Sequence, residues 1–176
     1  MTKFFKNLYR LLSIGSPLFI ILNYIRNFLT NYKTKKKSKK IENIIYEKFQ
    51  SVNNNEKWFC NNLYYLSTNF KNFKNIKNIL EIGSYEGRSA IFFLKNFSDT
   101  KITCVDTWAG SDEHNSVNFE LIEKNFDFNT SFYQSNNILI KHKMTSNDFF
   151  KKNNKFFDLI YVDGDHSSDQ VKIDLI

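Results

Sequence analysis

Residues 80–90 read LEIGSYEGRSA. A short apolar run, 79–83, ends in a turn that two glycines interrupt, and a helical pattern follows from Arg88 to Asn96. Gly83 and Gly87 permit a tight turn and a close approach of the backbone to a ligand. The free amides at the start of the helix favour a carboxylate or a phosphate. The stretch therefore predicts a strand, a ligand-binding turn and a helix.

Three further strand-like runs follow this one along the chain. They are residues 102–106, 138–142 and 156–163. Strands that alternate with helices form right-handed βαβ units, in which the strands are parallel. The sequence therefore predicts an α/β fold, with an open parallel sheet of about four strands behind N-terminal helices.

The basic residues are concentrated at the start of the chain. Residues 1–40 hold ten of the 25 Lys and Arg and none of the 18 Asp and Glu, so the remainder carries a net charge of −3. A nucleic-acid enzyme usually spreads its basic residues over the face that binds. The charge distribution therefore argues against nucleic acid as a partner.

Residues 1–40 form a basic, amphipathic segment. Residues 3–12 have helical spacing with a cationic face, and Ser16-Pro17 indicates the start of a second helix. Polar residues interrupt every window of the roughly 20 apolar residues that a membrane span needs. A helix lying on an anionic membrane surface fits, with the polybasic run 33–40 attracted to the headgroups. The alternative is a helix that packs on its own domain or a partner, with a solvated linker behind it.

Residues 41–74 are expected to form a helical cap, and residues 75–176 the main domain. The cap reads as two helices joined by a polar turn at Asn53-Asn54-Asn55.

Cys60 and Cys104, the two cysteines, lack the spacing of a metal or disulfide framework. They are interpreted as structural residues in a reducing, cytoplasmic compartment, where the basic segment would place the protein peripherally on the inner face of the membrane.

A second polar cluster, Val105-Asp106-Thr107-Trp108, closes the next predicted strand. A carboxylate about 20 residues past a glycine turn suits hydrogen bonding to two ribose hydroxyls, and Trp108 could flank a purine. For Asp106, a helix cap or turn role is the alternative. The glycines are spaced Gly-x-x-x-Gly, which disfavours a nicotinamide-dependent enzyme, whose turn reads Gly-x-Gly-x-x-Gly.

Residues 80–90 resemble the first motif of the class I S-adenosylmethionine (SAM)-dependent methyltransferases. The similarity is greatest to the catechol and caffeoyl-CoA O-methyltransferases and the bacterial methyltransferase 24 family, and residues 106–114 and 144–148 resemble further stretches of these proteins. The resemblance spans about 75–176 and implies a Rossmann-like sheet of the class I type, with SAM as cofactor. It also implies O-methylation of a small hydroxylated acceptor. We expect this acceptor to be a glycan sugar or a lipid-linked intermediate, and the membrane-like N-terminal segment motivates the second option.

The resemblance also assigns cofactor contacts. In relatives, the positions of Glu81, Tyr85 and Ser89 surround the methionine moiety, that of Asp106 holds the ribose, and residues like Ser146 and Asn147 contact adenine. The full set of implied cofactor-binding residues is Glu81, Gly83, Ser84, Tyr85, Gly87, Ser89, Asp106, Thr107, Trp108, Ser146, Asn147 and Asp163.

Residues 157–167, FDLIYVDGDHS, deliver two acids and a histidine after the fourth predicted strand. In relatives the position of Asp163 ligates a divalent metal, and a lysine base stands where this chain has His166. Histidine, with a pKa of about 6.5, suits a proton acceptor near neutral pH. Asp163 and His166 are thus the expected catalytic residues, with Mg²⁺ on Asp163 and Asp165. The alternative is that Asp165 caps a helix and His166 bonds backbone.

The remaining strands and metal ligands of the relatives come after the position that matches Ile176. The chain is therefore expected to be C-terminally truncated, or completed by another chain, and to be poorly stable and weakly active alone. A second functional hypothesis is a non-catalytic remnant of the fold that acts as a membrane-surface module. The sequence gives no indication of oligomeric state.

Overall fold

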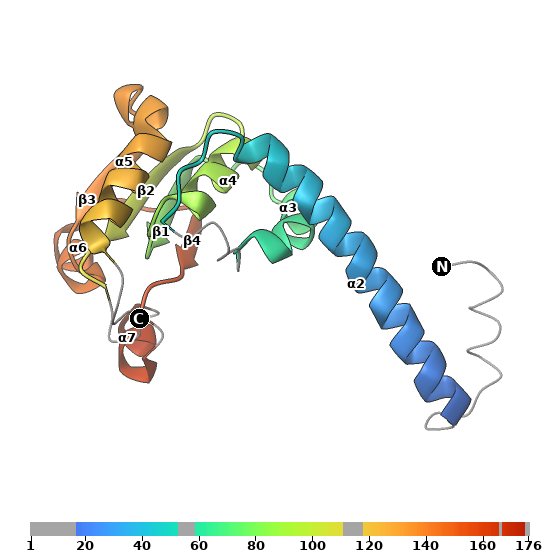
Figure 1. Cartoon of the computed structure of the whole chain (residues 1–176). Coiled ribbons are helices and arrows are strands. Elements are labelled where there is room, and N and C mark those ends of the chain that lie inside the picture. Colours follow the sequence, from blue (N-terminus) through green and yellow to red (C-terminus); the bar gives the residue numbers. More distant parts are fainter. Residues whose placement is uncertain (1–16, 53–58, 111–117, 166, 175–176) are drawn as a thin grey trace.

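The computed structural model describes residues 17–52, 59–110, 118–165 and 167–174. Its centre is a sheet of four strands, all parallel, in the order β3-β2-β1-β4 (Figure 1). The strands are β1 (Asn78–Ile82), β2 (Lys101–Asp106), β3 (Leu139–Lys143) and β4 (Leu159–Val162). The predicted α/β fold with a parallel sheet is confirmed.

The strand order reverses at β1. The chain moves outward from β1 to β2 and β3, then returns to the other side of β1 as β4. Ile82, at the end of β1, is in register with Val105 of β2 and Val162 of β4. The carboxyl ends of the strands therefore share one rim, and the reversal places a crevice there.

Helices cover both faces of the sheet. They are α4 (Arg88–Asn96), α5 (Phe119–Ser135), α6 (Ser146–Lys152) and α7 (Ser168–Asp174), which follow β1 to β4 in turn. The larger apolar core joins one sheet face to α4, α5, the short helix η1 (Phe59–Asn62) and α3 (Leu63–Phe70). On the other face, Phe149 of α6 packs against Leu80, Ile82 and Val105.

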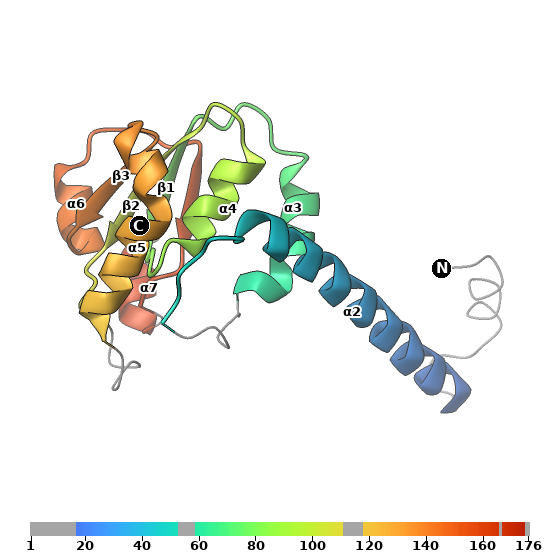
Figure 2. The same ribbon diagram turned by 45° about the horizontal axis from the view of Figure 1, so that its top comes forward.

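Helix α2 (Pro17–Ile45) extends away from the sheet as an arm (Figures 1 and 2). Its last turns pack on the domain, with Thr34 and Ser38 buried and Ile41 and Ile45 against the larger core. The expected boundary at residue 40 thus falls inside a helix. Lysine is a good helix former, and no glycine or proline interrupts residues 18–45.

Among the described residues, none of the helices has the length and apolar character needed to cross a membrane. Pro17 opens α2, as the Ser16-Pro17 pattern predicted. The helix expected over 3–12 and the turn at Asn53–Asn55 lie outside the described residues.

The strand and helix bounds agree with the sequence patterns except at β4. β1, β2 and β3 begin and end within a residue of their predicted bounds, and α4 matches its prediction. β4 begins at Leu159 rather than at Phe156, because Phe156 is 96% exposed and Asp158 turns its carboxylate onto the amides of Lys77 and Asn78.

Candidate functional site

A cavity of about 300 Å³ lies at the carboxyl ends of the four strands. Every strand contributes the residues that follow it, and α5 and α7 close the sides. The lining residues used below are Gly83, Tyr85, Asp106, Thr107, Trp108, Met144, Ser146, Asp163, Asp165, Gln170 and Asp174. The hollow therefore lies where an open parallel sheet binds its ligand.

The Asp106 carboxylate connects the loops after β1 and β2. Its Oδ2 accepts hydrogen bonds from the amides of Ser84 (2.8 Å) and Tyr85 (2.9 Å), and its Oδ1 accepts from the amide of Trp108 (2.7 Å). Two carboxylate oxygens offer about four acceptor positions. Three are used by the protein, so Asp106 both shapes the glycine turn and keeps acceptor capacity for a ligand.

Trp108 joins the same two loops from the other direction. Its indole Nε1 donates to the carbonyl of Tyr85 (2.8 Å), and its side chain is nearly buried. Trp108 and Tyr85 both have positive φ, 47° and 48°, which is rare for bulky residues. Such strain persists only where the surroundings enforce it, and it concentrates at ligand sites.

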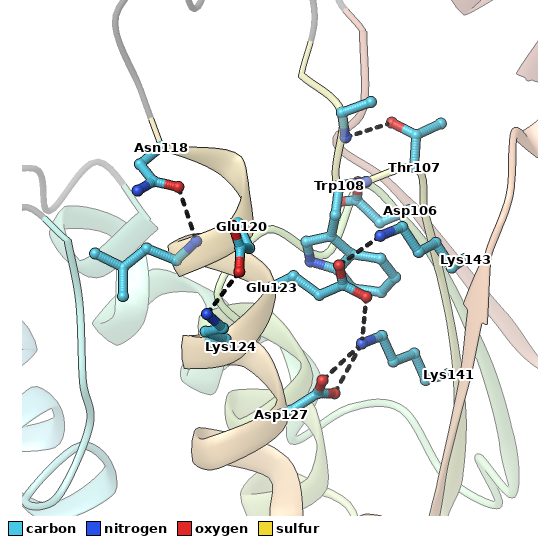
Figure 3. Close-up of polar contacts among 12 residues, drawn as sticks. Asp106, Thr107, Trp108, Asn118, Glu120, Glu123, Lys124, Asp127, Lys141 and Lys143 are labelled. Carbon is cyan, nitrogen blue, oxygen red and sulfur yellow. Dashed lines mark hydrogen bonds and ion pairs between the residues drawn. The ribbon is translucent and has the colours of Figure 1, made fainter.

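An ion-pair cluster holds the Trp108 ring from outside the cavity (Figure 3). Lys141 of β3 donates to Glu123 (2.9 Å) and Asp127 (2.8 Å) of α5, and its Nζ lies 4.6 Å from the centroid of a Trp108 ring. Lys143 bonds the other oxygen of Glu123. Burial lowers the pKa of Lys141, but the two carboxylates outweigh it and leave the pKa raised.

Gly83 lets the loops after β1 and β4 touch. It has a φ of 84°, and a Cβ at this position would overlap the carbonyl of Asp163. The amide of Asp163 in turn donates to the carbonyl of Ile82 (2.8 Å). A side chain at position 83 would therefore push the β4 loop out of the cavity wall.

Glu81 is a fully buried acid behind the cavity. Cys104 of β2 and Tyr161 of β4 are its register partners, and the Cys104 thiol donates to its Oε2 (3.4 Å). Burial raises the Glu81 pKa from 4.5 to about 7, an effect that the hydroxyls of Ser89 and Ser84 only partly offset. Glu81 Oε1 and Ser84 Oγ are buried without a well-formed hydrogen bond among the described residues.

Glu86 is another buried acid, in the glycine turn itself. Its Oε1 accepts from the amide of Val52 (2.6 Å) and from Asn125 of α5 (2.8 Å), and its Oε2 accepts from Ser51 (2.5 Å). The sequence pattern gave Glu86 no role. It ties the segment after α2 to the turn and to α5.

Helix α7 contributes a polar group on the β3 side of the cavity. The Ser146 hydroxyl donates to Asp174 Oδ1 (2.6 Å), and Gln170 Nε2 donates to both Ser146 Oγ (3.0 Å) and Asp174 Oδ1 (2.8 Å). Ser146 and Asp174 are buried. The residue expected to contact adenine therefore already has partners from α7.

The predicted cofactor residues divide into two groups. Those that line the cavity are Gly83, Tyr85, Asp106, Thr107, Trp108, Ser146 and Asp163. Glu81, Ser84, Gly87, Ser89 and Asn147 are not among its lining residues, and the buried Asn147 Oδ1 has no hydrogen-bond partner among the described residues. His166 lies outside the described residues.

The sequence patterns did not identify several residues of this site. Lys141, Glu123 and Asp127 act through Trp108, while Gln170 and Asp174 line the wall. Of these, Gln170 and Asp174 leave one signal in the sequence: they are four residues apart on a helix that follows a strand, so they lie on the same face of it.

The described residues do not form a metal site around Asp163 and Asp165. Asp163 Oδ2 accepts from the Tyr161 hydroxyl (3.0 Å), and Asp165 Oδ1 accepts from the amide of Ser167 (2.8 Å). No group of three or more acidic, histidine or cysteine side chains that could hold a metal occurs in the described part of the chain. A Mg²⁺ site needs more oxygen ligands than this pair presents.

The fold and the cavity define a doubly wound α/β protein with a cavity at the strand tips. A family model described as a methyltransferase domain matches residues 80–176, and the chain belongs to this family. No curated protein matches the chain in sequence.

Three solved structures are similar in fold. One is a Staphylococcus aureus protein assigned as a caffeoyl-CoA O-methyltransferase, with 19% identity and a TM-score of 0.44, over 78% of this chain and 57% of that one. Another is an O-methyltransferase from Bacillus cereus in complex with S-adenosylhomocysteine (SAH), with 16% identity, a TM-score of 0.43 and coverage of 81% and 60%. A Klebsiella pneumoniae protein assigned as an O-methyltransferase has 16% identity, a TM-score of 0.40 and coverage of 90% and 58%. The chain spans less than two-thirds of the length of each.

The pKa of Glu81 predicts a pH-dependent stability. Between pH 4.5 and about 7, the folded chain retains a proton that the unfolded chain has released, so the free energy of unfolding falls as pH rises. The loss amounts to about 3 kcal/mol over that window. Glu81→Gln, which stays uncharged, should remove this slope from urea unfolding curves recorded across the window.

Asp99→Asn is the matched control, because the Asp99 side chain is 85% exposed and its ion pair with Lys77 is long, at 3.9 Å. It should keep the wild-type slope. A Glu81→Gln profile parallel to that of the wild type would show that Glu81 is ionised in the folded chain throughout the window.

Proposed function

We propose that this chain binds SAM in the cavity at the strand tips and serves methyl transfer to a small acceptor. The proposal rests on one observation: the turn that begins at Gly83 and the Asp106 side chain meet at the ends of neighbouring strands, beside the cavity. The Ser84 amide of that turn donates a hydrogen bond to Asp106 Oδ2 (2.8 Å). Membership of the methyltransferase domain family supports it.

The residues present suit such a cofactor. The left-handed Gly83 leaves the turn without a side chain where the β4 loop approaches, and the turn faces a cavity of about 300 Å³. Asp106 retains about one acceptor position for a ribose hydroxyl, while Gly83, Tyr85 and Asp163 would hold the amino-acid end. When bound, SAM supplies a methyl group on a sulfonium centre, and these residues bind and orient it.

The acceptor we propose is a small hydroxylated molecule, such as a glycan sugar or a lipid-linked intermediate. Asp163 is exposed beside Gly83 at the cavity. We assign acceptance of the hydroxyl proton to Asp163 and to His166, which follows it by three residues in the sequence. The Asp163 and Asp165 pair does not suit Mg²⁺ by itself, so no metal enters this proposal.

Replacing Asp106 tests cofactor binding directly. Asp106→Asn keeps the shape but turns one acceptor oxygen into a donor facing backbone amides, so the affinity for SAH should fall by about 10- to 100-fold. Isothermal titration of the purified chain with SAH measures this loss.

Asp158→Asn is the matched control. Asp158 also accepts two backbone amides, from Lys77 (2.8 Å) and Asn78 (2.9 Å), but at the start of β1, away from the cavity. It should lower thermal stability and leave SAH affinity within about twofold. No SAH binding by the wild type, or an equal loss in both variants, would remove the cofactor assignment.

We also propose that α2 attaches the protein to an anionic membrane surface. Lys33, Lys36 and Lys40 are exposed on the face of α2 away from the buried Thr34 and Ser38, and no described carboxylate pairs with them. Such charges contribute about 1 kcal/mol each near anionic lipid.

Vesicle sedimentation tests this attachment. Replacing Lys36 and Lys40 by glutamine should weaken binding to phosphatidylserine-containing vesicles by roughly 30-fold, and pure phosphatidylcholine vesicles should not bind the protein. The exposed pair Lys71 and Lys74, changed in the same way, is the control and should bind like the wild type. Equal binding by both variants would refute a role for α2, and vesicle binding without SAH affinity would favour a non-catalytic membrane module.

A further inference from the structure

The carboxylate of Asp174 is buried at the wall of the cavity, and no positively charged side chain of the described residues pairs with it. The side chain is 7% exposed, and among the described residues no lysine or arginine forms an ion pair with it. Its Oδ1 accepts from Ser146 and Gln170, whereas no described residue donates to its Oδ2. A buried carboxylate is costly unless its acceptor positions are filled.

The side-chain donors of Ser146 and Gln170 already form hydrogen bonds within the protein. The Ser146 hydroxyl donates to Asp174, and the Gln170 amide nitrogen donates to Ser146 and Asp174. The nitrogen of Gln170 must be the atom facing Asp174, because a carboxylate only accepts. On these cavity-lining residues, two oxygens receive no hydrogen bond from the described part of the chain, Asp174 Oδ2 and Gln170 Oε1, and both are acceptors.

The position of this group along the rim indicates which part of the cofactor it meets. Strand order places the tips as β3, β2, β1, with Ser146 following β3, Asp106 ending β2 and Gly83 following β1. In SAM the ribose lies between the base and the amino acid. With the ribose at Asp106 and the amino acid at Gly83, the base extends toward Ser146 and α7.

We propose that Asp174 and Gln170 select the cofactor's base by accepting hydrogen bonds from the exocyclic amino group of adenine. That group presents two N–H donors to the two spare acceptors. Hypoxanthine has a carbonyl oxygen in place of the amino group. That oxygen would face Asp174 Oδ2 and Gln170 Oε1, which are also acceptors, and would leave the buried carboxylate without a hydrogen-bond donor. This inference rests on the proposed function, since it requires SAM in the cavity.

Titration with two ligands tests the selection. SAH and S-inosylhomocysteine differ only in that the amino group of adenine is replaced by a carbonyl, with a proton added on the ring. The wild-type chain should bind SAH about 10- to 100-fold more tightly, because an unpaired buried acceptor opposes the inosine analogue. Equal affinities would overturn the assignment of Asp174 and Gln170 and leave the proposed function standing. Binding of neither ligand would overturn both.

Asp174→Asn gives the reciprocal measurement. An amide nitrogen can donate to the carbonyl of hypoxanthine, so the preference for SAH should shrink to about threefold or less. Asp169→Asn is the control on the same helix, since the Asp169 side chain is 91% exposed and pairs with Lys172; it should keep the wild-type preference. If Asp174→Asn weakens both ligands equally, the carboxylate binds a part common to both, such as the ammonium, and the inference fails.

Discussion

The Asp106 carboxylate is the interaction on which the site depends. It accepts three backbone amides, from Ser84, Tyr85 and Trp108, and so fixes the turn after β1 against the turn after β2. Charge-assisted bonds of this kind are stronger than neutral ones. They hold Tyr85 and Trp108 in the left-handed conformation that bulky residues otherwise avoid. Without this carboxylate the two loops would lose three of the hydrogen bonds that join and shape them, and the bond from the Trp108 indole to the Tyr85 carbonyl would remain.

Two outer layers support that anchor. On the α5 side, Lys141 is held by Glu123 and Asp127 beneath the Trp108 ring. On the N-terminal side, Glu86 accepts hydrogen bonds from the Ser51 hydroxyl and the Val52 amide, in the segment that follows α2. Helix α2 and the glycine turn after β1 are therefore physically connected through residues 50–52, although α2 itself extends away from the sheet (Figures 1 and 2).

Much of the fold was predictable from local patterns, and the finer geometry of the site was not. The apolar runs that end at Gly83 and Asp106 predicted β1, β2 and the edge of the sheet where both strands end. This was possible because a buried strand and a glycine turn can both be recognised from a few consecutive residues. The role of Asp106 as an acceptor for its neighbours depends on the register of β1 with β2, which joins residues more than 20 positions apart. Likewise, the sequence gives Lys141 no special role until α5 packs beside it. The sequence also left open whether the lysine run 33–40 follows a helix as a linker, whereas the structure places it within α2.

A crystal structure of the chain with SAH tests the central claim most directly. The account predicts the ligand in the cavity, with its ribose on Asp106 Oδ1 while Oδ2 keeps the amides of Ser84 and Tyr85. A ligand bound elsewhere would contradict the account. So would an Asp106 side chain turned away from the loop amides.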